Sequence, residues 1–190
     1  MSSSPESRYI RNIDAQRLPP QKTIEGLGKS AEGIVIDCMN EKLRDKGMTV
    51  RPATKFEDSG VKHEGGKQVD AVVYYMGGKP AMCIQITTAQ NQSFQMEKVK
   101  QLTEKPFVRL EEMKNGDVPI PKVVVGLNPK DVESFLNNPD FSQHPQIWEK
   151  ISSNITECLQ SVQNMTKYDK EKAKAQELLL IFQSEGSTSH

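Results

Sequence analysis

Hydrophobic and polar residues alternate in the middle of the chain, on either side of a glycine pair. Residues 69–75 and 80–87 are rich in β-branched and other apolar side chains, and Gly77-Gly78 lies between them. Runs of this kind, joined by a short turn that contains glycine, predict a β-hairpin. We expect this hairpin to be the centre of the fold.

Side chains of a hairpin point alternately to its two faces. A turn over residues 77–78 places Asp70 opposite Gln85, and a turn over residues 77–80 places it opposite Thr87. Either register puts these three polar side chains on one face. The other face carries apolar residues: Val69, Ala71, Val73, Tyr75, Met82, Ile84 and Ile86. Polar groups on a largely buried ribbon need partners or a function, so the three form the first candidate site.

The segment before the hairpin predicts a helix over residues 30–46, capped by Ser30 and ended by Gly47. Its apolar residues recur at helical spacing (Val35, Ile36, Met39, Leu43), and Asp37, Glu41, Arg44 and Asp45 form the solvated side. Glu32 is in phase with the apolar residues. We therefore expect Glu32 on the buried side of this helix.

Strand and helix signals continue through the rest of the chain. A first strand is expected over residues 48–56, followed by a polar loop at 57–67. After the hairpin we expect a helix that starts at Ser93, a second helical piece at 107–113, and a buried strand at 122–127. Further helices are expected at 130–136 (capped by Asn128), 145–165 and 169–182, with a strand as the alternative for the final apolar run.

This order predicts an α/β fold with a small mixed central sheet flanked by helices. Residues 1–23 are expected to form a flexible N-terminal arm and residues 184–190 a disordered tail. A single domain would span residues 24–183, with its core in 28–127 and a helical C-terminal part in 128–183.

The composition indicates the cellular compartment of the protein more clearly than its function. Lys plus Arg and Asp plus Glu number 25 each, so no net charge draws the 190-residue chain to nucleic acid or to an anionic membrane. Three separated cysteines, without a Cys-x-x-Cys pair, indicate buried thiols in a reducing compartment and argue against structural zinc. No apolar run is typical of a membrane span or signal peptide, so we expect an intracellular protein, cytoplasmic or nuclear.

The order of the predicted elements resembles the restriction-endonuclease-like, or PD-(D/E)xK, superfamily. A helix with Glu32 is followed by a strand, a strand with Asp70, a turn, and a strand with Gln85-Ile86-Thr87. The helix text also resembles the opening of archaeal Holliday-junction resolvases. Residues 69–102 resemble the nuclease-like domains of Crinkler effectors and retrotransposon hot spot proteins, in which Gln-x-Thr replaces (D/E)xK. Those domains often carry a histidine just after that strand, where this chain reads Asn91-Gln92-Ser93. The likeness covers residues 28–127.

The resemblance implies a Mg²⁺ site formed by Asp70, Gln85 and Glu32, with Thr87 beside it as a fourth active-site residue. A neutral amide at position 85 would lower the affinity for the ion, because hard cations prefer carboxylates. Thr87 cannot replace the usual lysine, for which Lys67, Lys98 and Lys100 are substitutes. The expected protein is a weak metal-dependent nuclease of effector type that acts on DNA or RNA. The alternative is an inactive nuclease-like module that binds nucleic acid or a protein partner.

Each candidate residue also has a structural interpretation. Asp70 could bond loop amides, Gln85 and Thr87 could pair across the ribbon or cap the following helix, and Glu32 could be an ordinary first-turn carboxylate. Among the other residues, the histidines His63 and His144 are expected in solvent, and the aromatic residues Phe135, Phe141 and Trp148 in or over the core. The charged run 167–174 is expected to be a solvated helical face, with a nucleic-acid patch as the alternative.

Overall fold

The computed structural model describes residues 24–54, 69–88, 106–110 and 112–183. The expected N-terminal arm, the polar loop at 57–67, the helix from Ser93 and the C-terminal tail lie outside the described residues.

Helix α2 (Ile24–Leu43) continues into a short 3-10 turn, η1 (Arg44–Lys46), and ends at Gly47 with a φ of 69°. The predicted end is therefore confirmed. The predicted start is wrong, because the hydroxyl of Ser30 donates to the carbonyl of Gly26 at 2.9 Å from inside the helix. A serine bonded to the carbonyl four residues earlier continues a helix instead of capping it.

The sheet has the strand order β1-β2-β3-β5-β4. Its strands are β1 (Met48–Pro52), β2 (Ala71–Tyr75), β3 (Pro80–Thr87), β4 (Phe107–Val108) and β5 (Ile120–Gly126). β1, β2 and β3 are successively antiparallel, whereas β3 and β5 are parallel and β4 is antiparallel to β5. The predicted small mixed sheet is confirmed.

The hairpin of β2 and β3 forms as predicted, around a turn at residues 76–79 in which Gly78 has a φ of 76°. Ala71 pairs with Ile84, which is the register expected for the shorter turn. The register shifts between Val73 and Tyr74, so one strand bulges near the turn. Val69 is an exception to the expected alternation: it packs in the cluster on the opposite face from Ala71, because the chain bends at Asp70 before β2 begins.

The second helical piece expected at 107–113 is wrong. Phe107 and Val108 form the edge strand β4, which pairs with Pro121 and Ile120 of β5. A short apolar run suits either helix or strand, and pairing with a partner distant in sequence decides between them.

The C-terminal helices agree closely with expectation. They are α5 (Pro129–Asn137), α6 (Pro145–Met165) and α7 (Asp169–Gln183), with a short 3-10 turn, η2 (Phe141–Gln143), before α6. The side chain of Asn128 accepts a bond from the amide of Lys130 at 2.9 Å, which confirms the predicted cap. The final apolar run is helical, so the strand alternative for it does not hold. No described helix is long and apolar enough to cross a membrane.

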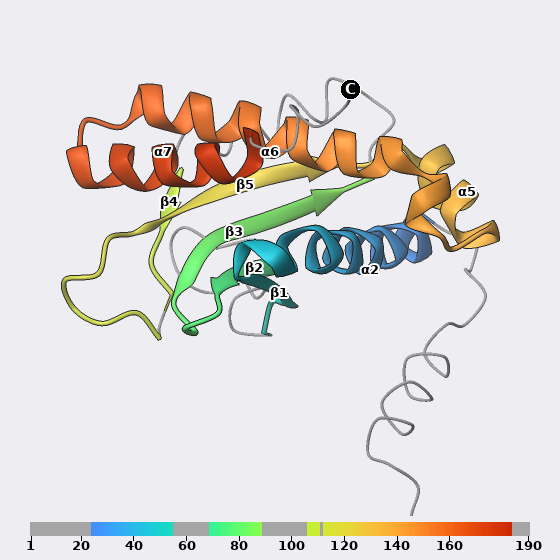
Figure 1. Ribbon diagram of the computed structural model, residues 1–190, viewed down its shortest axis with the longest axis horizontal. Coiled ribbons are helices and arrows are strands. Elements are labelled where there is room, and N and C mark those ends of the chain that lie inside the picture. Colours follow the sequence, from blue (N-terminus) through green and yellow to red (C-terminus); the bar gives the residue numbers. More distant parts are fainter. Residues whose placement is uncertain (1–23, 55–68, 89–105, 111, 184–190) are drawn as a thin grey trace, which may run out of the picture.

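The described helices share one core cluster with one face of the sheet: α6 and α7 lie together along β5, and α2 lies along β1 and β3 (Figure 1). The larger core cluster joins residues of α2, α5, α6 and α7 to Val73, Ile84 and Val123 of the sheet. A smaller cluster lies on the other face and contains Val69, Val72, Tyr74, Cys83, Leu110 and Ile120. Here we call these surfaces the helix face and the second face. This arrangement confirms the α/β class.

Side chains singled out by the sequence mostly lie where expected. Phe135 is buried, and Phe141 and Trp148 pack partly buried against the core. Cys38 and Cys83 are buried free thiols, and Cys158 is partly buried. The prediction for His144 is wrong: it is buried, its Nε2 lies 3.0 Å from the carbonyl of Asn138, and its ring meets Phe135 edge-on.

Candidate functional site

The predicted polar residues lie toward the carboxyl-terminal ends of the parallel strands β3 and β5. β2 runs antiparallel to β3, so the start of β2 lies beside the end of β3 (Figure 1). The regular register of β2 with β3 begins at Ala71, which pairs with Ile84, and Asp70 lies in the bend just before it. The side chain of Asp70 is half-buried. The pairing of Asp70 with Gln85 stays a prediction, because the described register starts at Ala71.

Asp70 is held in place by backbone bonds on both sides. Its amide donates to the carbonyl of Ile84 at 2.8 Å, and its carbonyl accepts from the amide of Ala53 at 2.9 Å. Its carboxylate oxygen Oδ2 accepts a bond from the amide of Ile86 at 2.5 Å. The carboxylate thus takes a place in the strand ladder. This agrees with the structural interpretation of Asp70 as an acceptor of backbone amides, although the amide belongs to a strand and not to a loop.

Gln85 and Thr87 point to the second face. They alternate along β3 with Ile84 and Ile86, which belong to the core cluster of the helix face. Gln85 is 5% exposed and Thr87 is 7% exposed. Within the described residues, the buried oxygen Oε1 of Gln85 accepts no hydrogen bond, although Gln85 has other interactions. Buried amide and hydroxyl groups are costly without partners, so this face is polar for a structural or a functional reason.

Lys122 joins this polar set, and sequence reasoning missed it. The parallel register pairs Cys83 of β3 with Lys122 of β5, so Lys122 lies on the second face, diagonal to Gln85. It is 7% exposed, which is rare for lysine because burial penalises the ammonium ion. The signal was a lysine at the start of the apolar run 122–127. Its meaning became clear only from the register.

Glu32 belongs to helix α2 and lies at the same height along the strands as the end of β3. The side chain of Asn40 in α2 bonds both the amide and the carbonyl of Val50 in β1, at 2.7 and 2.9 Å. Along α2, Glu32 lies about 12 Å before Asn40. Along β1, Ala53, which bonds Asp70, lies about 10 Å after Val50. Because these two lengths are similar, Glu32 and Asp70 lie at a similar height along the sheet. The blue N-terminal end of α2 accordingly lies near the tip of β3 (Figure 1). A shared pocket of Glu32 with Asp70 and Gln85 stays a prediction, because Gln85 points to the opposite face.

These groups offer oxygen ligands of low total charge. Asp70 supplies a carboxylate and Gln85 an amide carbonyl, both of the kind that Mg²⁺ prefers. The described residues contain no group of three or more His, Cys, Asp and Glu side chains placed to hold a metal ion. The donor set therefore fits a hard cation in kind but lacks a second carboxylate on the same face. The substitute lysines 67, 98 and 100 lie outside the described residues.

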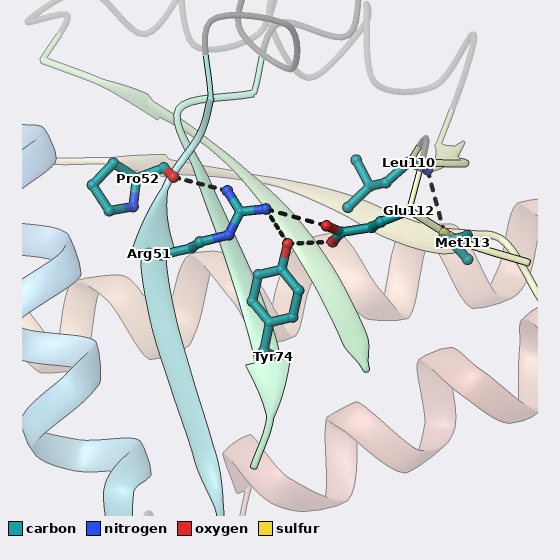
Figure 2. A network of polar contacts seen from close by, with 6 residues as sticks. All are labelled: Arg51, Pro52, Tyr74, Leu110, Glu112 and Met113. Carbon is teal, nitrogen blue, oxygen red and sulfur yellow. Dashed lines mark hydrogen bonds and ion pairs between the residues drawn. The ribbon is translucent and has the colours of Figure 1, made fainter. Parts of the chain in front are cut away.

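On the second face, a polar network joins β1 and β2 to the segment between β4 and β5 (Figure 2). The guanidinium of Arg51 donates to the hydroxyl of Tyr74, which donates in turn to the carboxylate of Glu112. Arg51 also lies 3.7 Å from that carboxylate, 3.0 Å from the carbonyl of Pro52 and 4.8 Å from the centre of the Tyr74 ring. Side chains of β1 and β2 thereby fasten the segment between β4 and β5 to the sheet.

That segment also covers the second face with apolar side chains. Leu110 is buried in the smaller core cluster and Met113 packs against it. The amide of Met113 donates to the carbonyl of Leu110 at 3.1 Å, which closes a turn beside Glu112. The segment lies over the part of the sheet next to Lys122.

On the helix side, Tyr75 joins the hairpin to α7. Lys174 donates to the hydroxyl of Tyr75 at 2.6 Å, and that hydroxyl donates to Glu177 at 2.5 Å. Burial, followed by the Glu177 carboxylate, raises the pKa of Tyr75 well above its ordinary value. Burial lowers the pKa of Lys174, and Glu177 partly offsets this effect. Perturbed groups often mark active sites, but this cluster lies at the turn end of β2, away from Asp70.

Comparison with known proteins gives no relative: no family model, no curated protein and no solved structure matches this chain.

Proposed function

We propose that this chain is a degenerate nuclease of the restriction-endonuclease-like fold, a weak metal-dependent phosphodiesterase that acts on nucleic acid. The order of elements supports this assignment. α2 precedes the antiparallel strands β1, β2 and β3, and β5 returns parallel to β3. The order of helix, strand and hairpin is the one on which the resemblance of the sequence rests.

The observation that carries the proposal is the bond from the amide of Ile86 to the carboxylate of Asp70, which brings Asp70 close to Gln85, the preceding residue of β3. These residues lie at the ends of the parallel strands β3 and β5, where α/β proteins commonly bind ligands. The N-terminal part of α2, with Glu32, reaches the level of these strand ends. Asp70, together with Gln85 on the second face or with Glu32 from the helix face, would hold a divalent cation. Such an ion would polarise the scissile phosphate and lower the pKa of a bound water molecule.

Lys122 completes the proposed site. On β5 it occupies the strand next to Gln85, whereas the related nucleases carry their lysine two residues further along the same strand. A buried ammonium ion interacts strongly with an anion because the surrounding dielectric constant is low. In the proposed reaction, Lys122 stabilises the negative charge that develops on the phosphate. Thr87, at the lysine position of the family motif, would contribute only a hydroxyl hydrogen bond.

Cleavage assays test this proposal. The full-length protein is incubated with plasmid DNA, a single-stranded oligonucleotide and RNA, with millimolar Mg²⁺ or Mn²⁺ and with EDTA. We expect metal-dependent cleavage that Asp70→Asn and Lys122→Met each lower by about 100-fold or more, which is the range for loss of one charge-stabilising group. Glu133→Gln, an exposed glutamate on α5, is the matched control and should cleave like the native protein. Cleavage that persists in EDTA and is unaffected by Asp70→Asn would come from a contaminant, whereas metal-dependent cleavage that Asp70→Asn leaves unchanged would refute the role of Asp70.

A second candidate function is a nuclease-like module that binds nucleic acid or a protein partner without cleaving. The bond between Asp70 and the Ile86 amide favours it, because one oxygen of this carboxylate already has a structural role. Fluorescence anisotropy with labelled single-stranded and duplex oligonucleotides in EDTA separates the two functions. Saturable binding without cleavage in either metal would support the module, and absence of both would reject a nucleic-acid function.

A further inference from the structure

A cavity of about 630 Å³ opens on the helical layer, between α2, η2, α6 and the end of α7. No residue of the proposed nuclease site lines it. Its volume is in the range of sites that bind small molecules. Its walls include the aromatic residues Phe141, Trp148 and Phe182, and a row of polar side chains along α6: Glu149, Ser152, Ser153, Thr156 and Glu157.

The aromatic walls are fixed by contacts with one another and with the core. The rings of Trp148 and Phe182 are stacked, with centroids 6.3 Å apart. Phe141 stacks on Phe135 at 4.5 Å, and the buried His144 meets Phe135 from the side. Trp148 and Phe141 are only partly buried, so each has ring surface left for a ligand. The apolar surface is therefore in place before any ligand binds.

The charged groups of the cavity are mainly acidic. Glu149 and Glu157 lie two helical turns apart on the same side of α6. Ser153, between them, donates its hydroxyl to Glu157 at 2.8 Å, which orients that carboxylate. The cation Lys42 on the opposite wall lies 3.7 Å from the carboxylate of its neighbour Glu41, which balances its charge. The lining therefore carries negative charge beside an exposed aromatic face.

We propose that this cavity binds a small organic ammonium ion with an aromatic or other apolar body. The apolar body would pack on Trp148 and Phe182, and the ammonium group would lie near Glu149 or near Glu157, which are about 12 Å apart along α6. An aromatic face attracts a cation through its quadrupole, and the carboxylates add ionic attraction. A neutral or anionic analogue of the same size loses the second interaction or is repelled. This proposal does not depend on the nuclease function.

Trp148 is the only tryptophan of the chain and therefore reports directly on this cavity. Its fluorescence is measured while the full-length protein is titrated with benzyltrimethylammonium, with benzyl alcohol as neutral probe and phenylacetate as anionic probe. We expect a saturable change with the cation, and affinities about tenfold or more lower for the other two probes. The single indole N–H resonance in a proton–nitrogen correlation spectrum gives a second measurement.

The double variant Glu149→Gln/Glu157→Gln tests the role of charge. Both residues are exposed, so the fold and its melting temperature should not change, as circular dichroism will verify. The affinity for benzyltrimethylammonium should fall about tenfold, while that for benzyl alcohol stays the same. Glu133→Gln serves as control. A linear, non-saturating response to the cation, equal affinity for phenylacetate, or an unchanged double variant would each overturn the proposal.

Discussion

The carboxylate of Asp70 accepts a hydrogen bond from the backbone amide of Ile86 at 2.5 Å and so joins the residue before β2 to strand β3. One side chain thus takes part in the fold and in the proposed site. Separating these roles requires substitutions that keep the hydrogen bond and remove the charge.

Asp70→Asn and Asp70→Ala make this separation. The amide oxygen of asparagine can still accept the bond from Ile86, whereas alanine leaves that amide without its acceptor. We expect Asp70→Ala to lower the free energy of unfolding by about 1.5–3 kcal/mol, and Asp70→Asn by less than about 1 kcal/mol. Urea denaturation followed by circular dichroism measures both values. Equal stability of the two variants would show that the bond contributes nothing.

Asn40 fastens α2 to the edge of the sheet through both atoms of its amide. Its Nδ2 donates to the carbonyl of Val50 and its Oδ1 accepts from the amide of that residue. Asn40→Ala leaves both backbone groups without these partners and should cost about 1–3 kcal/mol. Asn164→Ala, at an exposed position of α6, is the control and should change stability by less than about 0.5 kcal/mol. Similar denaturation midpoints for the two variants would refute this role.

The hairpin turn makes different demands on its two glycines. Gly78 has a φ of 76°, in the left-handed region, whereas Gly77 does not, and a Cβ atom would meet open space at either position. Gly78→Ala should therefore destabilise the protein by about 1–2 kcal/mol through backbone strain. Gly77→Ala should be neutral or slightly stabilising, because alanine restricts the unfolded chain. Thermal denaturation of both variants tests this contrast, and the reverse order would contradict it.

Long periodic elements could be predicted from sequence, and pairing over long distances could not. α6 begins and ends where the apolar spacing and Pro145 indicated, because burial of one helical stripe sets both the period and the length. β4 is the opposite case, since only its pairing with Ile120 and Pro121 makes Phe107 and Val108 a strand. His144 was expected in solvent because it lies in a proline-flanked loop, yet Phe135 packs against it.

The candidate site divides in the same way. Hairpin parity predicted the register in which Ala71 pairs with Ile84, because alternation and turn length fix it locally, whereas the bend at Asp70 leaves the pairing of Asp70 with Gln85 a prediction. Lys122 could not be assigned before the structure, since its face depends on the parallel pairing of β5 with β3 across the intervening residues. For Glu32, the apolar periodicity predicted which side of α2 it occupies. Its height along the sheet follows only from the contact between Asn40 and Val50.

The contact of Tyr75 with α7 predicts a loss of stability at alkaline pH. The pKa of Tyr75 in the folded protein is raised from 10.0 by burial and by Glu177, so the unfolded chain loses this proton first. The contribution of Tyr75 is therefore complete below pH 10 and declines as the pH rises above that value. Lys174 acts in the opposite direction, because its folded pKa lies below 10.5 and its cost disappears as the pH approaches that value.

Tyr75→Phe isolates the tyrosine contribution. Between pH 9 and 11, the native protein should lose about 1 kcal/mol more stability than Tyr75→Phe, a value reduced for the partial exposure of the cluster. Below pH 9 the variant should be less stable, because it lacks the bonds to Lys174 and Glu177. Tyr168→Phe, at a residue 59% exposed, controls for titration of other tyrosines. Parallel pH profiles of the native protein and Tyr75→Phe would mean that the Tyr75 hydroxyl titrates alike in the folded and unfolded chains, and that its bonds to α7 do not persist in solution.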